Sequence, residues 1–137
     1  MQDSKPISTP LLINFKLSSS VSPSNKAESM KMSRVPYASA VESLMFAMIC
    51  TRPNIAQAVT AVSRYMANLG REHWNTIKRI LRYIKGTSNA ALHYGGSEST
   101  VRDYVDSDFA SDLEKRKSTI GYVFIIVGGA VSWVSKL

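Results

Sequence analysis

The chain has 137 residues, which is enough for one small domain or for parts of two. Its 17 Lys and Arg against 10 Asp and Glu give a formal net charge of +7, which favours polyanions such as nucleic acid or an anionic membrane surface. An ordinary solvated surface explains the same balance. The chain has one cysteine, Cys50, so an internal disulfide is excluded. It has only two further candidate zinc ligands of the histidine type, so a zinc site is not expected.

The N-terminal segment, residues 1–36, is rich in Ser, Pro and Lys, a composition that buries too little to order itself. We expect a flexible linker in which one apolar patch, residues 10–15, docks on the rest of the chain. That patch is too short for the apolar region of a secretory signal peptide. No segment reaches the length of a membrane span, so no transmembrane segment is expected.

Residues 37–89 have the apolar spacing of helices. The first helix is predicted over 38–49, followed at the end of its apolar run by Cys50, which we expect to be buried. A second helix begins near Thr51 or Pro53, because Thr caps helices and Pro suits a first turn. A third is predicted over 72–85 and ends at Gly86.

From residue 90 the apolar period changes to two, which is typical of strands. Strands are predicted over 91–94, 101–109, 118–127 and 130–136, with turns at 110–117 and 128–129. The last three would form an antiparallel meander that stops near Leu137 with an open edge. The fold class is therefore predicted to be α+β, with two or three helices followed by a truncated three-stranded antiparallel sheet.

Several sequence blocks occur in an order and spacing that resemble copia-type retrotransposon Pol polyproteins. They are Ser4–Leu11, Val35–Met45, Thr51–Ala56, Arg82–Thr87, Tyr104–Ala110, Arg116–Tyr122 and Val131–Lys136. The resemblance runs from the end of the reverse transcriptase into the first strands of ribonuclease H. It implies that residues 37–89 are the end of a reverse transcriptase and that 90–137 are an incomplete ribonuclease H-like β-meander.

The same resemblance implies that most of the catalytic carboxylates are missing. Asp106 matches the first carboxylate of ribonuclease H, whereas the others and the polymerase aspartates have no counterpart in this sequence. Asp106 and Asp108 would lie on one face of a strand and could hold Mg²⁺ weakly, although a pair of solvated acids on an edge strand is the simpler and preferred explanation. We therefore expect no enzyme activity and no cofactor, with Mg²⁺ required only by a complete ribonuclease H.

The third predicted helix carries two stripes. Trp74, Ile77, Leu81 and Ile84 form the apolar stripe, which would face the core. The basic stripe is a candidate polyanion-binding surface, as on a helix that follows phosphates, and a plain solvated helix face is compatible with it. Its members are Arg71, Lys78, Arg79, Arg82 and Lys85.

This helix also contains Arg79-Ile80-Leu81-Arg82, which matches the RxLR motif, and the whole stretch resembles a secreted RxLR effector of a grapevine-infecting oomycete. That resemblance implies a non-catalytic protein that is secreted, enters the cytoplasm or nucleus of plant cells and suppresses cell death, through host proteins or anionic phospholipid. The alternative is a cytoplasmic relic of the polyprotein that binds RNA–DNA hybrid weakly, and an active nuclease is the third hypothesis. A motif in mid-helix, with Leu81 facing the core, is unusual for such effectors.

Overall fold

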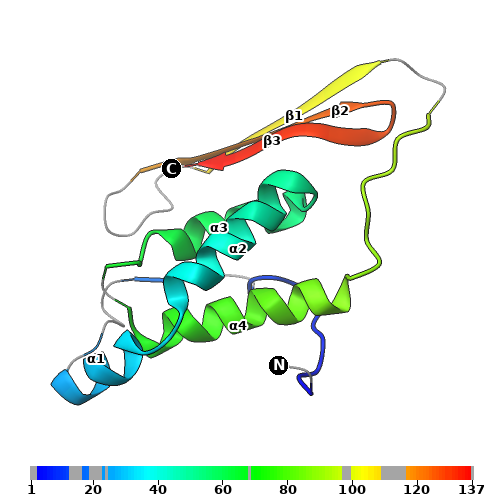
Figure 1. The fold of residues 1–137 in the computed structure, drawn as a ribbon. Helices are drawn as coiled ribbons and strands as arrows, with labels where there is room; N and C mark the ends of the chain where they lie inside the picture. The colour runs from blue at the N-terminus through cyan, green and yellow to red at the C-terminus, as the bar shows by residue number, and fades with distance from the viewer. Residues whose placement is uncertain are drawn as a thin grey trace.

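The computed structural model describes residues 3–12, 17–18, 23, 25–67, 69–96, 100–108 and 117–136. Helices form one part of the molecule and a three-stranded sheet forms the other (Figure 1). Helices α2 (Tyr37–Cys50) and α3 (Ala56–Ser63) lie between the sheet and helix α4 (Arg71–Gly86). The predicted α+β class is confirmed.

The core lies between α2, α3 and α4. Its fully buried side chains come from all three helices and from η2 (Pro53–Ile55), a short 3₁₀ helix before α3. They include Val41, Leu44, Ile55, Val59, Val62, Ile77 and Ile80. The phenol of Tyr37 also lies here and donates a hydrogen bond to the carbonyl of Val62 at 2.7 Å. Burial, and the neighbouring Tyr65, raise the pKa of the Tyr37 phenol well above its usual range.

Helix α1 (Lys26–Ser33) was not predicted, and it adds one helix to the two or three expected. Asn25 caps it, because its side-chain oxygen accepts a hydrogen bond from the backbone N–H of Glu28 at 2.8 Å. Only Met32 of this helix is buried, so the sequence of α1 lacks the apolar stripe by which an amphipathic helix is predicted. The division of the chain into three domains stays a prediction.

Cys50 was expected to be buried and is exposed, because it lies at the last position of α2, beyond Leu44, the last buried residue of this helix. Among the described residues, no helix has the length and apolarity that crossing a membrane requires.

The sheet consists of β1 (Val101–Asp108), β2 (Thr119–Ile126) and β3 (Gly129–Lys136), antiparallel and in that order. The strand predicted over 91–94 is wrong, since these residues form no strand. They pass beside the start of β3 without forming a strand ladder with it: Tyr94 donates its hydroxyl to the carbonyl of Ala130 at 2.6 Å, and the next residue, Gly95, donates its N–H to the carbonyl of Val127 at 3.2 Å. The turn predicted at 110–117 lies largely outside the described residues.

The β2–β3 hairpin turns at Val127 and Gly128, one residue earlier than predicted. Both residues have positive φ, 51° and 79°, as a two-residue type I′ turn requires. Glycine adopts this conformation freely, whereas it strains a β-branched valine.

Replacing Val127 by asparagine is therefore expected to raise the free energy of unfolding by about 1 kcal/mol, because a left-handed backbone costs an ordinary side chain about 1–2 kcal/mol and asparagine avoids most of that. Urea denaturation followed by circular dichroism measures the change. Gly128→Ala is the control and should destabilise the chain, since it places a Cβ at φ 79°. A loss of stability on Val127→Asn would contradict the turn described here.

Candidate functional site

Asp106, the predicted match to a ribonuclease H carboxylate, is exposed on β1 and pairs with Gly121 of β2. The backbone of Asp108 belongs to the same strand, and the position of its side chain lies outside the described residues. Nowhere in the described ranges do three or more His, Cys, Asp or Glu gather closely enough to hold a metal ion. The described carboxylates therefore do not form a two-ion site, and the Mg²⁺ pair stays a prediction.

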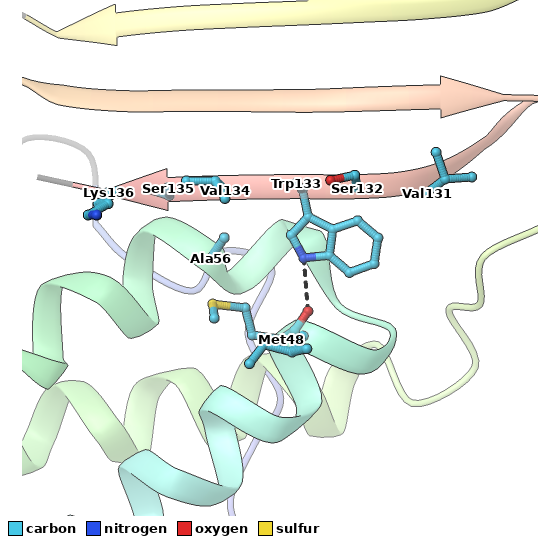
Figure 2. A pocket seen from close by; sticks show the side chains of 9 residues that line it. Met48, Ala56, Val131, Ser132, Trp133, Val134, Ser135 and Lys136 are labelled. Atoms are coloured by element: carbon cyan, nitrogen blue, oxygen red, sulfur yellow. Dashed lines mark hydrogen bonds between the residues drawn. The ribbon is translucent and has the colours of Figure 1, made fainter.

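Two grooves separate the sheet from the helices. One, of about 530 Å³, is lined by Asp106 and Tyr104 from the sheet and by Asn54 and Gln57 from the helical side, among others. The other, of about 410 Å³, is mainly apolar and is lined by Met48, Ile49, Ala56 and residues of β3 (Figure 2). Trp133 is among the residues that line both grooves, and its indole lies between β3 and α2 (Figure 2).

The RxLR residues lie in the middle of α4, and their burial differs from the expectation. Ile80, the variable position of the motif, is fully buried in the core. Leu81, expected to face the core, is half-buried at its margin. Arg79 and Arg82 are also half-buried. The motif is thus part of a packed helix rather than an accessible segment.

Residues 3–12, which we call the strap, run alongside α4 and contact its basic stripe. Arg79 donates from Nη2 to the hydroxyl of Thr9 at 3.0 Å. Arg82 donates from Nε to the carbonyl of Lys5 at 2.7 Å, and Lys85 donates from Nζ to the carbonyl of Ser4 at 3.0 Å. Of these contacts only the docking of the apolar patch was predicted, and its Leu11 packs against the core.

The two remaining basic residues of the stripe, Arg71 and Lys78, make no hydrogen bond or ion pair within the described ranges. Arg71 is exposed in the first turn of α4 and Lys78 is half-buried in its middle. At 1.5 Å per residue, Arg71 and Lys85 are roughly 20 Å apart along the helix axis. A stripe of this length can follow several successive phosphates of a nucleic-acid strand.

His73 and Thr76, two polar residues that sequence reasoning did not place in the core, are buried on the face of α4 opposite the stripe. Nδ1 of His73 accepts a hydrogen bond from the backbone N–H of Gly70 at 2.9 Å, and its ring stacks on Tyr65 with 4.3 Å between centroids. His73 therefore caps the start of α4 and is a structural residue.

No protein-family profile and no solved structure matches the chain. Over its full 137 residues the chain is 51% identical to a retrovirus-related Pol polyprotein from transposon TNT 1-94 of Nicotiana tabacum, of which it covers 10%. Over 107 residues, 77% of the chain, it is 43% identical to Secreted RxLR effector protein 161 of Plasmopara viticola, of which it covers 75%. The chain is therefore similar to one segment of retrovirus-related Pol polyproteins from transposons.

An uncharacterised mitochondrial protein of Arabidopsis thaliana is 34% identical to the chain, over 99% of the chain and 54% of its own length. The chain thus spans about a tenth of the tobacco Pol polyprotein and about half of the mitochondrial protein. Both predicted resemblances, to copia-type Pol polyproteins and to the oomycete effector, are confirmed. That the sheet is of ribonuclease H type stays a prediction.

Proposed function

We propose that this chain is a non-catalytic, nucleic-acid-binding part of a copia-type Pol polyprotein, and that the basic stripe of α4 contacts the phosphate backbone of an RNA–DNA hybrid. The observation that carries the proposal is the stripe itself: five basic residues on the face of α4 opposite its buried face, with Arg71 and Lys78 unoccupied among the described residues. Such contacts bind phosphates by charge and carry no sequence information.

The salt dependence of binding tests this proposal. Removing two phosphate contacts with Arg71→Gln and Lys78→Gln should reduce the slope of log affinity against log salt by about 2, since each contact contributes close to one. Fluorescence anisotropy with a short labelled RNA–DNA hybrid at several salt concentrations gives the slope. The matched control is Lys31→Gln with Arg34→Gln, which removes the same charge from exposed residues at the end of α1.

An unchanged slope in the stripe variant, or an equal reduction in the control, would show that α4 is not the nucleic-acid interface. The non-catalytic part of the proposal has its own test. We expect no cleavage of the hybrid in Mg²⁺, and cleavage that Asp106→Asn abolishes would contradict it.

The likeness to the oomycete effector supports a second candidate function. On this hypothesis the chain is secreted, enters the cytoplasm or nucleus of plant cells and suppresses cell death there by contacting host proteins or anionic phospholipid. Expression in leaves should then reduce induced cell death, and Arg79→Gln with Arg82→Gln should restore it. Cell death that the wild-type chain leaves unchanged would count against this candidate. The strap contacts of both arginines favour the first proposal, because they engage the motif within the chain.

A further inference from the structure

The strap crosses α4 at its last turn, in a contact that only glycine allows. A Cβ added at Gly86 would lie 2.9 Å from Cβ of Pro6 and 3.3 Å from the carbonyl oxygen of Ile7. Both atoms are fixed to the backbone of the strap, so they can move away only if the strap moves. The strap therefore lies directly on the helix end, next to the residues that hold it.

The hydrogen bonds described above between the strap and the basic side chains all go to neutral oxygens. Two are backbone carbonyls, of Ser4 and Lys5, and the third is the hydroxyl of Thr9. Within the described ranges, Arg79 and Arg82 pair with no carboxylate, and the buried Nε of Arg79 has no hydrogen-bond partner. Guanidinium groups bind phosphate or carboxylate more strongly than a neutral oxygen, so an anion would satisfy these donors better than the strap does.

The strap is also weakly held elsewhere. Residues 3–12 form no helix or strand, and Lys5, Pro6, Ser8 and Thr9 remain exposed. Its apolar hold comes from Leu11, which packs against the core, and from the half-buried Ile7 and Pro10. A segment with few buried contacts opens at low free-energy cost. The three donors on α4 are therefore a large part of what keeps the strap in place.

We propose that the strap is a displaceable cover over Arg79, Arg82 and Lys85, which competes with nucleic-acid phosphates for these three donors. The proposal rests on the proposed function, because it concerns the regulation of the same stripe. Arg71 and Lys78 make the first contacts with the phosphate backbone. The neighbouring phosphates then take over the donors of Arg79, Arg82 and Lys85, and the strap leaves the helix.

Two variants weaken the cover without touching a basic residue. Gly86→Ala pushes the strap away from the helix end, and Thr9→Val removes the acceptor of Arg79 while keeping the size of the side chain. Each is expected to raise the affinity for a short RNA–DNA hybrid several-fold and to leave the salt slope unchanged, because the same five basic residues contact phosphates in every complex once the strap has left. Gly121→Ala is the matched control, because its Cβ would meet no atom closer than 3.6 Å.

Amide hydrogen exchange on the full chain reports the strap directly. Saturating hybrid should speed exchange at residues 7–9 and 11–12 while α4 becomes more protected. Equal affinity of the wild-type chain, both variants and the control would overturn the cover and leave the proposed function intact. Slower exchange in the strap on hybrid binding would overturn it as well, because the strap would then be part of the interface. If none of the chains binds hybrid, the proposed function and the cover both fall.

Discussion

Replacing Ile80 by alanine should lower the free energy of unfolding by about 3 kcal/mol, whereas Leu81→Ala should lower it by roughly 1 kcal/mol. Large-to-small substitutions of fully buried isoleucine cost about 2–5 kcal/mol, through lost burial and the cavity left behind. Ile80 is 0% exposed within the core, and Leu81 is only half-buried at its edge. Urea denaturation of the two variants, followed by circular dichroism, gives both values.

This difference decides how the RxLR motif can be tested. A variant in which all four residues of the motif become alanine would lose Ile80 and with it a large share of the stability of the chain, since small domains have only about 5–15 kcal/mol. Loss of any activity would then report unfolding. Arg79→Gln and Arg82→Gln leave Ile80 in place and are the informative changes. If Ile80→Ala and Leu81→Ala proved equally mild, the packing described for α4 would be wrong.

The helices of the core could be predicted because their apolar positions repeat at the helical period and Gly86 marks an end. The face that α4 buries was predicted less well. The apolar stripe was taken to run through Leu81, whereas Ile80 and the polar residues His73 and Thr76 occupy the centre of the interface. Thr76 donates its hydroxyl to the carbonyl of Glu72, at 2.9 Å. Polar residues that are satisfied locally in this way are invisible to a hydrophobicity pattern.

In the sheet and the candidate site, too, the features with a regular sequence pattern were predicted and those without one were not. Alternating apolar residues predicted β1, β2 and β3 to within a few residues, but the same alternation over 91–94 gave a false strand, because pairing depends on a neighbour and not on the pattern alone. The basic stripe was predicted from charge spacing along one helix. The strap that covers it was not, since its contacts join residues 70 and 77 positions apart and it carries no period of its own.

Trp133→Ala is expected to have the second large effect, a loss of about 3 kcal/mol together with looser attachment of the sheet. The indole of Trp133 lies between β3 and α2 and donates from Nε1 to the carbonyl of Met48 at 2.9 Å (Figure 2). That carbonyl lies in the last turn of α2, where the N–H of Arg52 bonds to Ala47 and leaves Met48 without its usual partner. Trp133 therefore both fills the gap between the layers and caps the helix. Its half-buried position places the cost at the lower end of the range for Trp→Ala.

Trp133→Phe separates these two roles. It keeps an aromatic ring between the grooves and removes only the donor to Met48, so it should cost about 1 kcal/mol, the usual worth of one hydrogen bond. Thr60→Val is the matched control for another link between the layers, the hydrogen bond from the Thr60 hydroxyl to the carbonyl of Ser135 at 2.8 Å. Equal losses for Trp133→Phe and Trp133→Ala would mean that the indole packs against little and acts as a donor alone.

The same variants locate the nucleic-acid interface. Helix α4 lies on the far side of α2 and α3 from the sheet (Figure 1), so loosening the sheet should leave the salt slope of hybrid binding unchanged. Trp133→Ala, assayed under conditions in which it is still folded, then contrasts with the Arg71→Gln and Lys78→Gln variant. Its free energy of unfolding should fall while the salt slope of hybrid binding stays at the wild-type value. A slope that fell with Trp133→Ala would place phosphate contacts on the sheet or in the grooves beside Trp133, and the interface could no longer be assigned to α4 alone.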